Sequence, residues 1–137
     1  MKSFKQYILL ACFAGSLAVV QSCQKYDDGP MISLVSRKNR VANTWKVDNY
    51  KINGTDYTSL VTGYEETFSK DGAYAYDWGI LDGSGTWAFK NNDQDIQLTG
   101  SDDHSSRKLT ILKLEEDQFW YTYLDGNDKY EMHLITK

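Results

Sequence analysis

Apolar and polar residues alternate in short runs along most of the chain, and turn residues separate the runs. Runs of this kind, bounded by Gly, Asn and Asp, are typical of the strands of β-sandwiches and β-barrels. The pattern predicts eight strands, at 45–52, 64–69, 73–78, 86–90, 95–99, 108–114, 118–124 and 129–136. Because tight turns join most of them, neighbouring strands should pair antiparallel. Such a meander hides its edges best by closing into a small, all-β, up-and-down barrel.

Turn signals fix where most strands end. Asn53-Gly54 is a strong hairpin dipeptide, and Lys70-Asp71-Gly72 separates the next two strands. The Gly-rich stretch Asp82–Gly85 is expected to turn the chain into the strand that starts at Thr86. The stretch Asp125–Asp128 is expected to close a final hairpin.

Alternation also predicts which side chains face the barrel interior. The expected inward set is Trp45, Val47, Tyr74, Tyr76, Trp78, Trp87, Phe89, Ile96, Leu98, Leu109, Ile111, Tyr130, Met132 and Leu134. Strand 118–124 is apolar on both faces, since Trp120 and Leu124 alternate with Phe119, Tyr121 and Tyr123, so the pattern does not choose between them. His133 alternates with Met132 and Leu134 and is expected to face outward.

The segment from Met31 to Asn43 has the spacing of a short amphipathic helix that leads into the first strand. Its three cations, Arg37, Lys38 and Arg40, fit a solvated helix face. Contact with acidic lipid or sugar is the alternative.

Residues 1–22 have the features of a signal peptide. A cationic start, Met1–Lys5, precedes the apolar run Ile8–Val20, which is too short to span a bilayer. Val20-Gln21-Ser22-Cys23 resembles the bacterial lipobox. The resemblance implies cleavage before Cys23, a thioether link from Cys23 to diacylglycerol, and acylation of its new amino group with a fatty acid such as palmitate. A buried N-terminal helix or an ordinary secretory signal with an incidental Cys is the alternative.

Residues 23–30 then form a flexible tether behind the acylated Cys. Gln24-Lys25-Tyr26-Asp27-Asp28 resembles the export signal that directs outer-membrane lipoproteins of Bacteroidota to the cell surface. The resemblance implies attachment to the bacterial outer membrane through acyl chains on Cys23. A solvated tether on a periplasmic protein is the alternative to surface exposure.

Composition excludes several function classes. Cleavage removes 22 residues with two lysines and no acidic residue, which changes the formal charge from −4 to −6. An acidic chain of this kind argues against binding of nucleic acid, which needs a basic face. Cys12 is lost and Cys23 is acylated, so thiol nucleophiles, disulfides and thiolate metal sites are not expected.

The motifs together resemble the lipocalin-like lipoproteins of Bacteroidota, over residues 31–137. The resemblance rests on Asn43–Val47, Asn53–Asp56, Glu66–Tyr74, Gly85–Phe89 and Leu112–Leu114. It implies a small lipocalin-like barrel in a family whose members mostly have no assigned activity. Two features depart from lipocalins proper: Asn43 replaces the Gly of their Gly-x-Trp motif, and no Arg follows Arg107 to stack on that Trp.

No catalytic constellation is recognisable, so we expect no enzyme activity and no cofactor. Gly83-Ser84-Gly85 lacks the following helix that a phosphate site needs. His104 lies beside Asp102 and Asp103, but a solvated acidic loop fits better there than a metal site. Asp125–Asp128 lacks most of the ligands of a calcium loop.

The remaining chemistry is an excess of aromatic side chains, which most simply fills the barrel. Four of them, Tyr76, Trp78, Trp87 and Trp120, are candidate ligand-binding residues, because aromatic rings stack on flat ligands and sugars. Trp78 is the best candidate, since it ends a strand where a barrel mouth would lie. We therefore expect a lipid-anchored domain that binds a small hydrophobic ligand or an envelope protein. The alternatives are a glycan-binding accessory of nutrient uptake and a filled barrel without a ligand.

Overall fold

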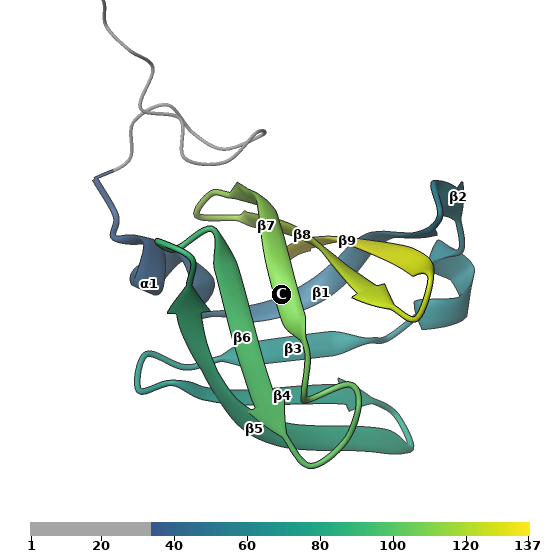
Figure 1. Cartoon of the computed structure of the whole chain (residues 1–137), viewed down its shortest axis with the longest axis horizontal. Helices are drawn as coiled ribbons and strands as arrows, with labels where there is room; N and C mark the ends of the chain where they lie inside the picture. Colours follow the sequence, from purple (N-terminus) through teal and green to yellow (C-terminus); the bar gives the residue numbers. More distant parts are fainter. Residues whose placement is uncertain (1–33) are drawn as a thin grey trace, which may run out of the picture.

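The computed structural model describes residues 34–137 as nine strands and two short helices (Figure 1). The helices are α1 (Arg37–Val41) and the 3-10 helix η1 (Thr58–Val61). The strands are β1 (Thr44–Ile52), β2 (Thr55–Asp56), β3 (Glu65–Phe68), β4 (Ala73–Trp78), β5 (Leu81–Lys90), β6 (Asp95–Gly100), β7 (Lys108–Leu114), β8 (Gln118–Asp125) and β9 (Asp128–Thr136). The predicted signal peptide, Cys23 and the tether lie outside the described residues.

Eight of the strands close into an antiparallel barrel, as the turn pattern predicts. From β3 to β9 each strand pairs with the next along the chain, and β1 pairs with both β3 and β9. The pairing of β1 with β9 extends from Trp45 opposite Thr136 to Ile52 opposite Tyr130, with one bulge after Val47. The short strand β2, which the sequence does not predict, adds to the end of β1.

The Asn53-Gly54 hairpin is confirmed. Both residues have positive φ, 51° and 82°, and Ile52 pairs with Thr55 across them. Two adjacent residues with positive φ are what a two-residue turn between twisted strands requires.

The turn expected at Asp82–Gly85 is wrong. The chain reverses at Gly79-Ile80, where Gly79 has φ of 69°, and β5 already begins at Leu81. Gly83 and Gly85 lie inside β5 for a steric reason: a Cβ on Gly85 would lie 2.3 Å from the carbonyl oxygen of Thr99, and one on Gly83 would touch the ring of Tyr76. Glycine within a strand marks a close approach of neighbouring chain.

Helix α1 lies at one end of the barrel, at the left of Figure 1, and its position falls within the predicted helical segment, of which residues 31–33 lie outside the described part. The Oγ of Ser36 caps its N-terminus by accepting from the backbone N–H of Asn39. Arg40 donates from Nη1 to the carbonyl oxygen of Leu114 at 2.6 Å. The indole N–H of Trp45 donates to the carbonyl of Val41 at 2.9 Å. These buried bonds fix the helix to the first strand and to β7.

Side chains fill the barrel interior. The rings of Phe68 and Phe119 meet edge to face at 5.6 Å, and Trp45 packs on Phe119 at 5.7 Å. The residues that face inward are close to the predicted set, and β8 points Phe119 and Tyr121 inward and Trp120 outward. The buried apolar residues are Val41, Trp45, Val61, Tyr64, Phe68, Tyr74, Tyr76, Trp87, Ile96, Leu98, Leu109, Ile111, Leu114, Phe119, Tyr121, Met132 and Leu134. A barrel of this size with such bulky residues has little room for an internal cavity.

Candidate functional site

The end of the barrel opposite α1 carries a small pocket, which we call the mouth pocket. The β1–β2 and β4–β5 turns, η1 and the β8–β9 hairpin gather at this end, at the right of Figure 1. The pocket has a volume of about 150 Å³. It is lined by Tyr50, Ile52, Leu60, Val61, Tyr64, Trp78, His104, Arg107, Tyr121, Tyr123 and Met132.

The floor of the mouth pocket is a tyrosine–glutamate cluster, formed by Glu66, Tyr64, Tyr74 and Tyr121. The hydroxyls of Tyr64 and Tyr74 each donate to Oε1 of Glu66 at 2.8 Å. The hydroxyl of Tyr121 lies 3.0 Å from both carboxylate oxygens. Tyr64 and Tyr121 also line the pocket, so a ligand there would touch residues bonded directly to Glu66.

Burial dominates the electrostatics of this cluster. Desolvation raises the pKa of Glu66 above its usual value, although the hydrogen bonds from the three tyrosines and the charge of Arg107 work against that rise. Desolvation and the neighbouring carboxylate raise the pKa of Tyr121 well above its usual value. The tyrosines therefore stay protonated, and they act as hydrogen-bond donors to Glu66.

The side wall of the mouth pocket presents a cation and an imidazole. The guanidinium of Arg107 lies 4.3 Å from the ring centre of Tyr123, a cation–π contact, and donates to the carbonyl oxygen of Asp103 at 2.8 and 3.0 Å. Tyr123 stacks on Tyr130, with ring centres 4.9 Å apart. Burial and the charge of Arg107 lower the pKa of His104, so its neutral form is favoured. The side wall of the mouth pocket therefore combines apolar rings with a small number of hydrogen-bond donors.

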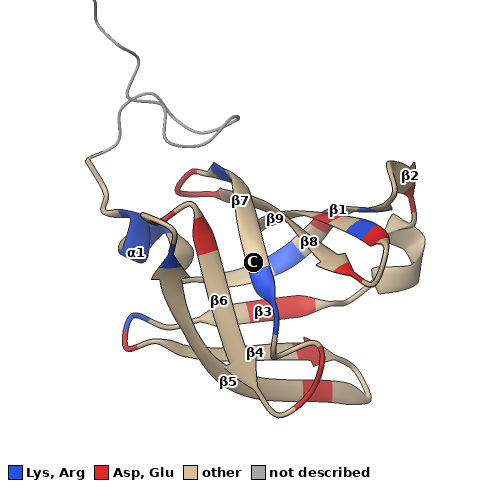
Figure 2. Ribbon diagram, in the orientation of Figure 1, with Lys and Arg blue, Asp and Glu red and all other residues tan. Residues whose placement is uncertain are grey.

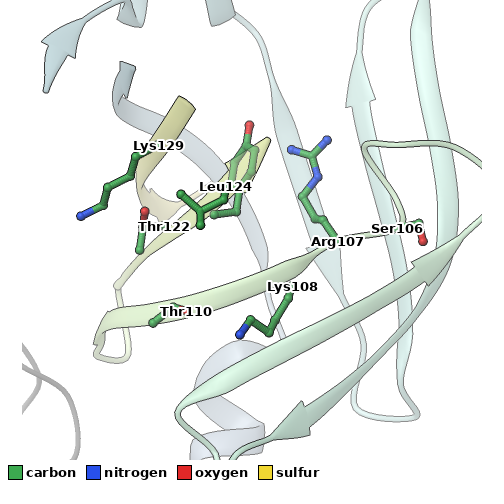
Figure 3. A pocket seen from close by; sticks show the side chains of 8 residues that line it. Ser106, Arg107, Lys108, Thr110, Thr122, Leu124 and Lys129 are labelled. Carbon is green, nitrogen blue, oxygen red and sulfur yellow. The ribbon is translucent and has the colours of Figure 1, made fainter. Parts of the chain in front are cut away.

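A second cavity, which we call the wall cleft, lies between β7 and the β8–β9 hairpin (Figure 3). Its volume is about 480 Å³. It is lined by Ser106, Arg107, Lys108, Thr110, Thr122, Tyr123, Leu124 and Lys129. Arg107 and Tyr123 belong to both cavities.

The four aromatic residues that the sequence singles out do not meet in one site. Trp78 lines the mouth pocket, and Tyr76 lies nearby, its ring stacked on Tyr64 at 6.1 Å. Trp87 lies towards the α1 end, where its indole N–H donates to the carbonyl oxygen of Ser69 at 2.9 Å. Trp120 is on the outer face.

The ring of Trp120 contacts two other side chains, those of His133 and Lys113. It stacks on His133 at 4.0 Å, and the ammonium of Lys113 lies 4.5 Å from its ring centre. His133 therefore faces outward, as predicted, and it bonds to Glu131 at 2.6 Å. This outer cluster is separate from the mouth pocket.

Sequence reasoning missed Glu66 and Arg107. The signal for Glu66 is its alternation with Tyr64 and Phe68, since all three are buried on the inward side of β3 and the residue before it. Arg107 lies in the loop before β7 and carries no periodic signal, so nothing in the sequence places it beside Tyr123.

Within residues 34–137, no group of three or more His, Cys, Asp or Glu side chains is placed to hold a metal ion. None of the helices in the same range has the length and apolar character needed to cross a membrane. The chemistry of the mouth pocket and the wall cleft is therefore that of aromatic rings, hydroxyls, a buried carboxylate and nearby cations.

Comparison with known proteins supports the fold. No family model matches the chain, and no curated protein matches it. Among solved structures, the chain is similar to the crystal structure of a lipocalin-like protein from Bacteroides uniformis, with a TM-score of 0.55 at 14% sequence identity. The match covers 72% of this chain and 99% of that chain. The chain thus has a lipocalin-like β-barrel fold, with eight strands in the closed barrel and one extra strand.

Proposed function

We propose that this protein is a lipid-anchored lipoprotein of the bacterial envelope whose lipocalin-like barrel binds a small, largely apolar molecule at the mouth pocket, without catalysis. The observation that carries the proposal is the position of that pocket. The interior is filled, and the space left at the open end is lined by aromatic rings with Arg107 and His104 at its side. Apolar pockets with a few well-placed polar groups are typical ligand sites.

The pocket limits the size and chemistry of the ligand. A volume of about 150 Å³ accommodates a single aromatic ring with small substituents. Tyr50, Trp78 and Tyr123 offer ring faces or edges, and Arg107 offers N–H donors. The best match is a planar, one-ring molecule with a hydrogen-bond acceptor.

A titration of the full-length, processed protein tests this site. We expect p-cresol and benzoate to give saturable ¹H–¹⁵N chemical-shift changes at Trp78, Tyr121 and Tyr123, and benzoate to bind more tightly because it pairs with Arg107. The variant Trp78→Leu should weaken binding of both probes. Trp120→Leu is the matched control, since it removes an indole from the outer face.

The proposal of a mouth ligand fails if neither probe produces saturable shifts, or if both tryptophan variants weaken binding equally. Native mass spectrometry of the protein purified from its own envelope extends the test. A molecule of one-ring size that co-purifies with wild type but not with Trp78→Leu would be identified as the physiological ligand.

The lipid anchor is a separate part of the proposal. It rests on the signal peptide at 1–22, the lipobox around Cys23 and the tether at 23–30. Two or three acyl chains on one Cys hold a protein on a membrane stably, since each buried methylene contributes about 0.8 kcal/mol. Because α1 and the mouth pocket lie at opposite ends of the barrel, the chain would approach the membrane from the end away from the pocket.

Detergent-phase partitioning of the full chain tests the anchor. Wild-type protein should enter the detergent phase with the mass of an acylated Cys23, and Cys23→Ala should stay in the aqueous phase. Equal membrane association of both proteins would overturn the lipidation. Protease treatment of intact cells separates surface exposure from a periplasmic location, because only a surface protein is cleaved.

A second candidate function, docking of an envelope protein, has one observation in its favour. Apolar side chains are exposed around the mouth, with Ile80 97% and Leu60 61% exposed, and Leu81 beside Ile80. Exposed apolar groups that gather at one end of a protein mark interaction surfaces. If crosslinking in intact cells captures one defined partner and Ile80→Ser abolishes the capture without changing probe binding, docking is the better account of the rim.

A further inference from the structure

The barrel wall is incompletely paired between β7 and β8. Their pairing runs from Leu114 opposite Phe119 and stops at Thr110 opposite Thr122. Both strands continue, β7 back to Lys108 and β8 on to Asp125, but there β7 pairs with β6 and β8 pairs with β9. Two residues beyond the last pair, Lys108 and Leu124 therefore line the wall cleft from the two strands instead of pairing.

The wall cleft joins the outer surface to the inner wall of the mouth. Residues alternate between the two faces of a strand, so Lys108 and Thr110 are on the outside of β7, and Thr122 and Leu124 on the outside of β8. Lys129 pairs with Leu124 and shares its outer face. The cleft also reaches Arg107 and Tyr123, which line the mouth pocket.

The cleft is basic in an acidic protein. Three of the described residues that line it are cations and none is acidic, whereas the whole chain has a formal charge of −4. Figure 2 shows the basic start of β7, and Figure 3 shows Lys108 and Lys129 on either side of Thr110, Thr122 and Leu124. The nearest carboxylate to Lys108 is Asp95 at 3.8 Å, a long contact to a lysine whose side chain is 60% exposed. The carboxylate of Asp95 is buried, with its side chain 8% exposed, whereas Lys108 remains largely open to solvent.

The geometry also limits what fills the cleft. Only two residues of β7 and three of β8 lie beyond the last pair, a stretch too short for an added β-strand. The volume of about 480 Å³ is in the range of small-molecule sites. Three hydroxyls, from Ser106, Thr110 and Thr122, lie among the cations. The hydroxyl of Thr122 donates to the carbonyl oxygen of Tyr130 at 2.6 Å and can accept from a ligand hydroxyl, whereas a hydroxyl such as that of Thr110 can donate or accept.

We infer that the wall cleft is a binding site for a small hydroxylated anion of the size of an acidic monosaccharide, whose acidic group pairs with Lys108 and Lys129 and whose hydroxyls bond to Thr110 and Thr122. The site is distinct from the mouth pocket and needs no ligand there. Residues shared by the two cavities are unsuitable for a test, so the variants below leave Arg107 and Tyr123 in place.

Calorimetry on the full-length, processed protein with glucuronate, glucose and inorganic sulfate tests the inference. We expect saturable binding of glucuronate at low ionic strength, with a dissociation constant of about 1 mM or lower. Lys108→Gln and Lys129→Gln should each weaken it about two- to fivefold, and the double variant about tenfold. Lys70→Gln is the matched control, because Lys70 is an exposed lysine in the β3–β4 turn.

Each outcome decides one part of the inference. Weaker binding in both cleft variants, with Lys70→Gln and Trp78→Leu unchanged, supports the cleft independently of the mouth pocket. If glucose binds as tightly as glucuronate, the site does not recognise the acidic group. If sulfate binds as tightly as glucuronate, the site does not recognise the hydroxyls. Absence of saturable glucuronate binding, or affinity unchanged in the double variant, would overturn the site.

Discussion

The tyrosine–glutamate cluster gives the sharpest test of how this barrel is held together. Glu66 is buried, and it accepts hydrogen bonds from three tyrosines, of which Tyr74 and Tyr121 are each only 2% exposed. Replacing Glu66 with Leu removes the shared carboxylate acceptor from two hydroxyls that water hardly reaches. The substitution therefore removes hydrogen bonds from tyrosine hydroxyls that cannot bond to water instead.

The size of the effect follows from the number of stranded groups. A buried polar group left without a partner costs about 1–3 kcal/mol, so the two hydroxyls cost about 2–6 kcal/mol in total. Removal of a buried carboxylate offsets part of that loss, because desolvation already disfavours its charged form. A domain of this size is stabilised by about 5–15 kcal/mol, so the variant should fold but lose a large part of its stability.

A double-mutant cycle with Tyr74→Phe isolates the hydrogen bond from other effects. In the wild-type background the substitution removes a bond to a carboxylate and should destabilise by about 1.5–3 kcal/mol. In the Glu66→Leu background it removes a stranded hydroxyl, so it should be neutral or stabilising. Urea denaturation followed by tryptophan fluorescence measures both values.

The expected coupling between the two positions is at least about 1.5 kcal/mol. If Glu66→Leu does not fold, Glu66→Gln replaces it, since the amide oxygen remains an acceptor. Tyr74→Phe should then cost less than in wild type, because a neutral bond contributes about 0.5–1.5 kcal/mol. An equal cost of Tyr74→Phe in all backgrounds would refute the shared-acceptor reasoning.

Three further predictions concern other parts of the barrel. Burial raises the folded-state pKa of Glu66, so its stabilising contribution is complete at acid pH and is lost as the pH rises above its ordinary pKa. Over that range the free energy of unfolding of wild type should fall relative to that of Glu66→Gln by up to about 1.4 kcal/mol per pH unit. The same pH dependence of the two proteins in urea denaturation would contradict this. Gly85→Ala should cost about 1–3 kcal/mol, because its Cβ would lie 2.3 Å from a backbone oxygen of β6, whereas the exposed neighbour Ser84→Ala should stay near wild type in thermal melts. Trp45→Phe should destabilise by about 1–3 kcal/mol and accelerate amide exchange in α1, since it leaves the carbonyl of Val41 without its buried donor.

Much of the fold follows from local signals in the sequence. Asn53-Gly54 adopts the two positive φ values of a tight hairpin, and alternation identifies most of the inward side chains. The error at Asp82–Gly85 shows the limit of such signals. Glycine is found both where the chain turns and where two strands approach closely. The neighbouring strand distinguishes the two cases, and at Gly85 the carbonyl of Thr99 leaves no room for a side chain.

The candidate site is less predictable, although one part of it follows from topology. In a meander of antiparallel strands, the ends of successive strands alternate between the two ends of the barrel. Trp78 ends β4, whereas Trp87 is near the end of β5, so they belong to opposite ends. The order of the strands along the chain is therefore enough to separate these two residues. Arg107 is different, because its contact with Tyr123 depends on the conformation of a loop.

The filled interior explains why both proposed sites lie at the periphery. A short barrel that closes with eight strands needs bulky residues inside, and here several are tyrosines, whose hydroxyls need acceptors when buried. Glu66 serves three of them at once, which turns the centre into a bonded cluster with no space for a ligand. Both proposed sites therefore lie outside this filled centre, the mouth pocket at one end of the barrel and the wall cleft at the gap between β7 and β8. Substitutions in the wall cleft should therefore change binding with little effect on stability, whereas substitutions in the tyrosine–glutamate cluster, which forms the floor of the mouth pocket, should change both.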